Sequence, residues 1–268
     1  MAMVITSRAP WRCRPSGLVA LDKTSPQAHG LMAWWPATPA GFNRDRVSGQ
    51  FSTSAAAGTA ACPLGDVAVN VAGANPTDCG TRADLSALTA ITLCAWVGEM
   101  TAIGSDTRIV QVGDKGTSPF VRYALEWGTS DFKVETNDGA SAVSTASGLG
   151  PFVWETWHHV CAVISSVERA VYVNGKKGTA GAGVTPATTT DACSIGYSTA
   201  FSNYFVGKIA DVRIYNRALS ADEVARLYDP GTRWSLYAPM VKRSYFDMAT
   251  GGGGGGGSTR RICSGIVG

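Results

Sequence analysis

Two adjacent histidines and a nearby cysteine are the side chains whose types and spacing suggest chemistry most directly. They are His158, His159 and Cys161. An imidazole beside a thiol can form a nucleophile pair in which the histidine takes the proton of the cysteine. Strand alternation would place His159 and Cys161 on the same face. The alternative is a buried strand in which both side chains only pack, and we favour packing over catalysis.

Paired carboxylates would be the other route to catalysis, because glycoside hydrolysis with retention uses two carboxyl groups about 5–5.5 Å apart. The nearest candidates are Glu126, Asp131 and Glu135. Their spacing does not put two carboxylates on one face of one strand. We therefore expect no catalytic residues and no enzyme.

The elements that would position such side chains are clearest between residues 208 and 228. Alternation over 208–215 predicts a half-buried strand. Ser220 can then act as N-cap, and Glu223 completes a capping box. The short helix ends before Asp229-Pro230-Gly231. Its apolar stripe consists of Val224, Leu227 and Tyr228.

The remaining chain reads as short strands separated by tight turns. Asn137-Asp138-Gly139 and Asn174-Gly175 are hairpin signals between alternating runs. Charged residues make up only 16% of the 268 residues, and 32 residues are glycine. This composition is typical of one large β domain. The net charge of +3 is too small to indicate binding to nucleic acid.

Five ordered stretches carry family-like patterns: Gly30–Pro36, Asp45–Gly49, Ile91–Val97, Trp157–Val163 and Val171–Lys176. Together they resemble the laminin-G-like, concanavalin A-like lectin and glucanase superfamily. The resemblance implies an all-β fold, a two-sheet antiparallel jelly-roll sandwich over residues 29–229 with one short C-terminal helix and extended terminal arms. It also implies that the His158–His159 strand is a packing motif.

The two ends are expected to lie outside this domain, as an extended arm over 1–28 and an aromatic, basic and Gly-rich tail over 230–268. Seven glycines at 251–257 predict a flexible tether. Aromatic residues interleaved with arginine and lysine are typical of protein interfaces. We expect these side chains to dock on a partner: Trp11, Arg12, Trp234, Tyr237, Tyr245, Phe246, Ile262 and Ile266.

The segments Ser7–Arg12 and Trp234–Pro239 resemble those of laminin-G-like proteins encoded in phage structural gene clusters. This resemblance implies a non-enzymatic virion decoration protein that attaches to a capsid or tail assembly. Its partner would be the major capsid protein or another virion protein, and homo-oligomers are expected. Localisation would be the virion, after synthesis in the host cytoplasm.

The alternative function is a carbohydrate-binding adhesion module that recognises cell-surface glycans. Aromatic rings would stack on sugars while amides and carboxylates bind hydroxyl groups. The candidate glycan-binding residues are Trp127, Asn137, Asp138, Tyr197, Asn203 and Tyr204. For Trp127 and for each of the others, core packing is the competing interpretation.

Calcium is the one cofactor that the resemblance implies, with ligands at Asp45 and Asp211. One family ligand is replaced by Ala210, so the expected set is incomplete. Asp45 could equally form an Asx turn, and Asp211 could pair with Arg213 or Lys208.

Cysteine content and targeting signals complete the expectations. The count of seven cysteines is odd, and we expect buried reduced thiols, with a Cys62–Cys79 disulfide as the alternative. The first residues lack the apolar run of a secretion signal. No stretch approaches the roughly 20 apolar residues of a membrane helix, so neither secretion nor membrane insertion is expected.

Overall fold

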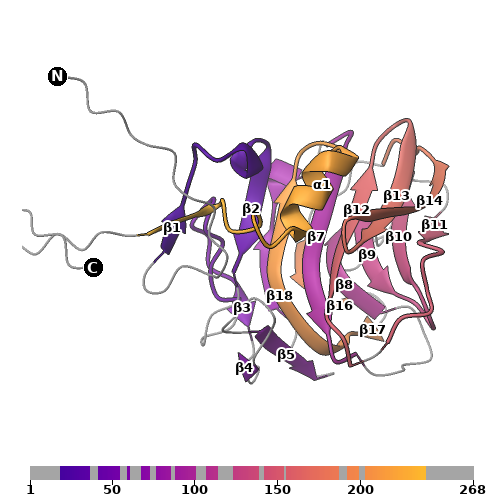
Figure 1. Ribbon diagram of the computed structural model, residues 1–268, viewed down its shortest axis with the longest axis horizontal. Coiled ribbons are helices and arrows are strands. Elements are labelled where there is room, and N and C mark those ends of the chain that lie inside the picture. The colour runs from indigo at the N-terminus through magenta and orange to yellow at the C-terminus, as the bar shows by residue number, and fades with distance from the viewer. Residues whose placement is uncertain are drawn as a thin grey trace, which may run out of the picture.

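A computed structural model describes residues 19–36, 42–54, 59–60, 68–72, 77–85, 88–100, 107–113, 123–138, 142–153, 155–186, 192–198 and 203–239. Two β-sheets pack face to face, and one α-helix lies outside them (Figure 1). Nearly all described strand pairs are antiparallel; β17 with β8 is the parallel exception. The expected concanavalin A-like all-β sandwich is therefore confirmed.

The first sheet has nine strands within the described residues. Its main path runs in the order β11 (Ala142–Ala146), β10 (Phe132–Asn137), β9 (Tyr123–Trp127), β8 (Thr107–Gly113), β15 (Ala192–Ile195), β6 (Thr77–Thr81) and β3 (Thr53–Ser54). The short strands β16 (Tyr197–Ser198) and β17 (Asn203–Tyr204) pair with each other and join the sheet at β8.

The second sheet has eight strands in the same part of the chain. Its path is β14 (Lys176–Ala182), β13 (Glu168–Val173), β12 (His158–Ile164), β7 (Ile91–Gly98), β18 (Val206–Tyr215), β5 (Ala68–Ala72) and β4 (Thr59–Ala60). Strand β2 (Leu31–Trp35) also pairs with β18. Two 3-10 helices, η1 (Pro26–Ala28) and η2 (Ala83–Leu85), lie between strands.

Strand β7 is buried along its whole length, although only one of its faces meets the opposite sheet. The outer face is covered by α1 (Ala221–Tyr228) and the chain after it. Trp96 of β7 stacks on Tyr228 with ring centroids 5.8 Å apart, and the Arg233 guanidinium lies 5.6 Å from the Trp96 centroid. The second sheet is therefore covered on both faces around β7, which explains why its strand has no exposed side.

The helix α1 begins and ends as its sequence predicts. The Ser220 side chain accepts a hydrogen bond from the Glu223 amide, and the Glu223 carboxylate accepts one from the Ser220 amide, so the capping box is present. Val224 and Leu227 are buried, as the apolar stripe requires. No helix of the described chain is long and apolar enough to cross a membrane.

The hairpin at Asn174-Gly175 is confirmed and joins β13 to β14. Both residues have positive φ, 52° and 77°, the backbone of a type I′ turn, which matches the twist of the flanking strands. Strands β10 and β11 also form a hairpin, with Asn137 opposite Ala142; Gly139 of its predicted turn lies outside the described residues.

Strand β18 contains a bulge that the alternation did not predict. The pairing register with β7 shifts between Ala210 and Arg213, and Asp211 adopts a φ of 51°. A non-glycine residue with positive φ is uncommon, and bulges re-aim side chains. Here the Asp211 carboxylate accepts a hydrogen bond from Arg213, with the two atoms 2.6 Å apart, and both side chains are buried.

The two ends of the described chain form a third, two-stranded ribbon. Strand β1 (Val19–Leu21) pairs with β19 (Tyr237–Pro239), and Val19 stands opposite Pro239. The Asp22 amide also donates to the Leu236 carbonyl at 2.8 Å. Residues 19–28 and 230–239 thus belong to the folded body, and the expected domain limits of 29 and 229 are too narrow.

Arg213 ties both terminal segments to β18. Its guanidinium donates to the Gln27 side chain at 2.9 Å and to the Arg233 carbonyl at 3.2 Å, besides pairing with Asp211. The Gln27 amide in turn donates to the Thr232 carbonyl at 2.9 Å. These segments are about 200 residues apart in sequence, so this buried cation specifies how they dock.

Candidate functional site

The outer face of the nine-stranded sheet carries a buried group of charged side chains. Arg108 of β8 stands opposite Glu126 of β9 and forms an ion pair with it. The same guanidinium reaches Glu135 of β10, with nitrogen and oxygen 3.3 Å apart. Leu125 pairs with Val134 on the core side, so the alternating Glu126 and Glu135 face outward. We call Arg108, Glu126 and Glu135 the charged triad.

Two tyrosines stand beside the charged triad. Tyr204 of β17 pairs with Arg108, and its ring stacks on Tyr197 of β16 with centroids 6.2 Å and planes 10° apart. Tyr197 is buried and Tyr204 half-buried. Burial raises the pKa of Tyr197 to about 12, so its phenol is neutral. The face therefore combines flat aromatic surface with charged hydrogen-bonding groups, the two kinds of group that sugar recognition uses.

The six expected glycan-binding residues do not converge on one place. Tyr197, Asn203 and Tyr204 lie together on the β16–β17 pair. Asn137 and Asp138 lie at the other end of β10 from Phe132, which is the cross-strand partner of Trp127.

Trp127 itself is a core residue, only 2% exposed. Its ring packs edge-on against Phe132 with centroids 4.8 Å apart. The expectation that Trp127 stacks on a sugar is wrong in this fold, because strand alternation turns its ring to the inner face with Leu125.

The two expected calcium ligands are already engaged by other groups. Asp45 is fully buried and accepts hydrogen bonds from the Trp34 amide, the Val47 amide and the Ser48 hydroxyl, besides an ion pair with Arg82 at 3.2 Å. The Val47 contact is the Asx turn that was the alternative interpretation.

Asp211 accepts from the Trp34 indole at 2.7 Å and from Arg213. Calcium takes six to eight oxygen ligands, whereas these two carboxylates face arginine and peptide or indole donors. The residues present do not fit a calcium ion, and both aspartates have structural roles instead.

Two of the expected partner-docking residues are buried inside the chain. Trp234 is 1% exposed and Tyr237 is 3% exposed. The Tyr237 ring packs edge-on against Trp34 at 4.8 Å and against Trp234 at 5.3 Å. They cover the outer face of the second sheet, so they cannot contact a partner as expected. The other docking candidates lie outside the described residues: Trp11, Arg12, Tyr245, Phe246, Ile262 and Ile266.

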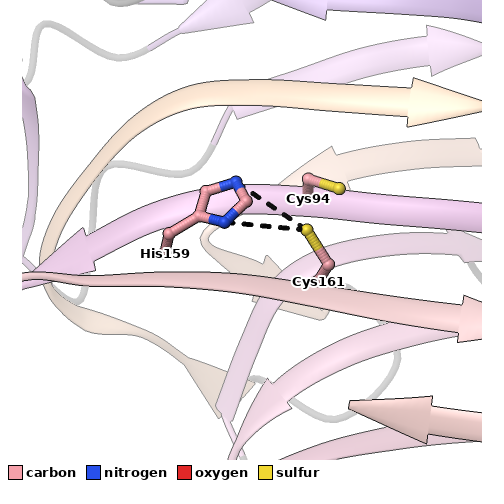
Figure 2. Close-up of side chains that lie close together, drawn as sticks. All are labelled: Cys94, His159 and Cys161. Atoms are coloured by element: carbon pink, nitrogen blue, oxygen red, sulfur yellow. Dashed lines mark hydrogen bonds between the residues drawn. The ribbon is translucent and has the colours of Figure 1, made fainter. Parts of the chain in front are cut away.

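His159 and Cys161 lie together on the outer face of the second sheet. Figure 2 shows His159 and Cys161 of β12 beside Cys94 of β7. The Cys161 sulfur lies 3.7 Å from His159 Nε2 and 4.0 Å from Nδ1. All three side chains are at most 3% exposed.

The protonation states of this cluster do not suit a nucleophile pair. Burial lowers the pKa of His159 to about 3 and raises the pKa of the Cys161 thiol. The imidazole and the thiol are therefore both neutral, and both side chains are buried. The geometry therefore favours packing over nucleophilic catalysis for His159 and Cys161.

The carboxylates considered for catalysis fall into two places. Asp131 accepts from the Ser147 hydroxyl and from the Gly148 amide at 2.7 Å, which links the β9–β10 turn to the segment after β11. Glu126 and Glu135 meet on Arg108 from neighbouring strands, an arrangement that single-strand spacing could not reveal. The sequence patterns did not indicate Arg108 as a site residue. Alternation in 108–112 could have shown that its side chain faces outward, but the residues that it contacts depend on strand register.

Free thiols are found at all four cysteines of the described chain: Cys79, Cys94, Cys161 and Cys193. Cys79 contacts Cys193. Cys62, the alternative disulfide partner of Cys79, lies outside the described residues.

Comparison with solved structures shows the same fold in carbohydrate-binding and toxin proteins. Domain 4 of the arabinanase AbnA from Geobacillus stearothermophilus, solved with arabinotriose, is 17% identical with a TM-score of 0.58, over 74% of this chain and 98% of that domain. The binding domain of Paraclostridial Mosquitocidal Protein 1 is 11% identical with a TM-score of 0.60, over 75% of this chain and 52% of that one. A sialidase from Trypanosoma rangeli is 18% identical with a TM-score of 0.55; the match covers 75% of this chain and 32% of that one.

Sequence comparison gives the family. No match was found among curated proteins. The family model described as the concanavalin A-like lectin/glucanases superfamily, of laminin-G type, matches residues 73–225. This range contains β7, β12, β18 and the beginning of the capped helix α1, whose sequence patterns also predicted the fold. The chain therefore belongs to the concanavalin A-like lectin/glucanase superfamily.

Proposed function

We propose that the chain is a non-enzymatic binding module. Its two terminal segments attach it to a larger assembly, specifically the capsid or tail of a phage virion. The observation that carries this proposal is the β1–β19 ribbon. Because Val19 pairs with Pro239, the points at which residues 1–18 and 240–268 join the described chain lie side by side. Two segments that start together can act on one partner surface.

The composition of these segments supports attachment. They contain Trp11, Arg12, Tyr245 and Phe246, and an apolar end with Ile262 behind seven glycines. Trp, Tyr and Arg are enriched at the energetic centres of interfaces. The partner would be the major capsid protein or another virion protein, and copies of this chain would occupy equivalent positions on the shell.

Truncation tests the attachment. Tagged full-length chain and a 19–239 variant are incubated with particles purified from the source, and co-sedimentation is measured. Both proteins should show the same cooperative melting, while only the full-length chain should sediment with the particles. Equal sedimentation of the 19–239 variant would place the contact on the jelly roll and overturn the proposal.

A second candidate is glycan recognition on the outer face of the nine-stranded sheet. The charged triad beside the half-buried Tyr204 ring favours it, because a flat apolar ring face and fixed hydrogen-bonding groups suit a sugar. The likeness of this fold to that of a domain solved with arabinotriose supports glycan recognition as a candidate function. Tyr204 and Glu135 would contact the sugar, and Arg108 would hold Glu135 in place.

Calorimetry with arabinotriose and a panel of bacterial surface oligosaccharides tests this candidate. Tyr204→Ala and Glu135→Gln should each weaken any binding at least about tenfold, which corresponds to about 1.4 kcal/mol. The matched control is Phe51→Ala, because Phe51 is 73% exposed and pairs with Arg44 rather than with β8, β9 or β10. Binding that Tyr204→Ala leaves unchanged would exclude this face.

A further inference from the structure

The cluster of Cys94, His159 and Cys161 combines three metal-ligating side chains on two neighbouring strands. Cys161 of β12 stands directly opposite Cys94 of β7. His159 precedes Cys161 by two residues, so its ring emerges on the same face, as Figure 2 shows. The potential ligand atoms all lie within 4.8 Å of one another.

The spacing of these atoms matches that of ligands around one ion. Zinc–sulfur and zinc–nitrogen bonds of about 2.3 and 2.0–2.1 Å place a sulfur and a nitrogen about 3.6–3.8 Å apart at tetrahedral to trigonal angles. The measured distance from Cys161 Sγ to His159 Nε2 is 3.7 Å. This sulfur and this nitrogen are therefore already separated as two ligands of one ion would be, although the ring must rotate to aim the Nε2 lone pair at the ion.

The polar contacts of the His159 ring also suit a metal site. In the described part of the chain, both hydrogen bonds shown for its ring nitrogens go to the Cys161 sulfur, which is a weak hydrogen-bonding partner. Buried polar side chains are normally bonded to oxygen or nitrogen. An imidazole and two thiols gathered without a carboxylate form a soft ligand set.

Charge balance is also favourable. Two thiolates neutralise a divalent cation, so the loaded cluster would add no net charge to the buried layer. Arg213 of β18 stands directly opposite Cys94 of β7 in the strand register. Its guanidinium already has a counter-ion in Asp211. With a monovalent cation, the remaining negative charge would lie beside Arg213.

We propose that Cys94, His159 and Cys161 form a binding site for a thiophilic d10 metal cation of the Zn²⁺ and Cu⁺ class. Binding replaces the two thiol protons by two metal–sulfur bonds, and the imidazole contributes its nitrogen lone pair without a proton change. Soft thiolate and imidazole ligands select these ions over Mg²⁺ or Ca²⁺. The site lies beneath Tyr228, whose ring stacks on His159 at 6.3 Å, so entry requires α1 to move and binding should be slow.

A second buried thiol pair provides a matched control within the same chain. Cys79 and Cys193 are also in contact and fully buried, but the metal-ligand cluster of the described residues does not include them. A response that depends on the Cys94 cluster and not on Cys193 therefore identifies the imidazole-containing site.

The experiment uses the full chain with Cys13, Cys62 and Cys263 changed to serine, which removes the thiols outside the described residues. The protein is purified under reducing conditions and titrated with Cd²⁺ as a spectroscopic probe, then with Zn²⁺ and with Cu⁺ in competition. We expect a thiolate-to-Cd²⁺ charge-transfer band that saturates at one ion per chain. The melting temperature should rise with each metal.

Variants decide between this site and nonspecific binding. Cys94→Ala, Cys161→Ala and His159→Gln should each weaken Cd²⁺ binding more than about 100-fold, beyond the usual effect of changing a group that only supports a ligand. Cys193→Ala should keep the band. The proposal fails if the parent shows no saturable band, or if the band survives Cys94→Ala and Cys161→Ala while both variants retain the parent's near-ultraviolet circular dichroism. Loss of the band in Cys193→Ala alone would also overturn it.

Discussion

Arg213 shows how one buried side chain can organise segments from both ends of a chain. Its guanidinium contacts Asp211, Gln27 and the Arg233 carbonyl, and its side chain is 2% exposed. A buried charge is costly unless it is paired and hydrogen-bonded. The bulge at Asp211 supplies the counter-ion at this position, and the terminal segments supply further acceptors.

Removing that counter-ion should therefore be strongly destabilising. Asp211→Asn leaves Arg213 buried without a charge partner, and we expect a loss of about 3–5 kcal/mol in the free energy of unfolding, measured by urea denaturation. The control is Glu168→Gln, which breaks the exposed Lys177–Glu168 pair and should cost at most about 1 kcal/mol. Equal losses in the two variants would contradict this account of Arg213.

Glu223 gives a pH dependence at the same scale. A hydrogen bond from Arg217 and bonds at the helix start lower the pKa of Glu223 from 4.5 to about 2. Because the folded-state pKa is lowered, the stabilisation is complete above the unfolded value and is lost as the pH falls through about 2.

The charge can be removed while the capping box is kept, because glutamine also serves at this position. Glu223→Gln should have a lower urea midpoint than the parent at pH 6, and the two midpoints should converge near pH 2. A gap that stays constant over this range would show that the charge of Glu223 is irrelevant to stability.

At the scale of elements, the short helix α1 acts as a cover for the second sheet. It has eight residues, too few to be stable alone, so its capping box and its buried Val224 and Leu227 must hold it in place. Its last residue, Tyr228, covers both Trp96 and His159. The helix thus explains why β7 and β12 are buried on both faces.

Loss of the N-cap should loosen this cover. Ser220→Ala removes the hydrogen bond to the Glu223 amide and should cost about 1 kcal/mol of unfolding free energy. In hydrogen-exchange measurements, the amides of α1 should exchange faster in the variant than in the parent. The amides of the β9–β10 hairpin should exchange at the same rate in both proteins. Uniform acceleration across the chain would mean that α1 is no separate local unit.

At the scale of the whole molecule, the terminal ribbon completes the sandwich. The Tyr237 ring packs against Trp34, and the Arg233 guanidinium lies over the rings of both Trp96 and Trp234. A jelly roll ending at residue 229 would expose this apolar layer.

Two truncations separate the ribbon from the tail. A 1–239 variant should melt at the same temperature as the full chain, because all the described contacts remain. A 1–229 variant loses Trp234 and Tyr237, and removing even one such buried ring costs about 3–5 kcal/mol. It should melt much lower or aggregate on expression. Equal melting of the two variants would show that residues 230–239 contribute little to the fold.

Much of this fold could be predicted from local sequence, because the signals are local in origin. The capped helix at 221–228, the turn at Asn174-Gly175 and the burial of the His159 strand follow from hydrogen bonds and alternation over a few residues. The family patterns in 91–97 and 157–163 then indicated which strands form one sandwich.

The candidate sites depended on tertiary structure instead. Arg108 meets Glu126 and Glu135 only because three strands pair in one register, and a shift of one residue would turn these side chains to the other face. Asp45 meets Arg82 only through the tertiary structure, whereas Asp211 pairs with Arg213 of its own strand, as one of the sequence interpretations allowed. Cys94 lies 65 residues or more from His159 and Cys161, and only the pairing of β7 with β12 brings the three ligands together. Local patterns determine elements, whereas strand register and the docking of the two ends decide which side chains meet.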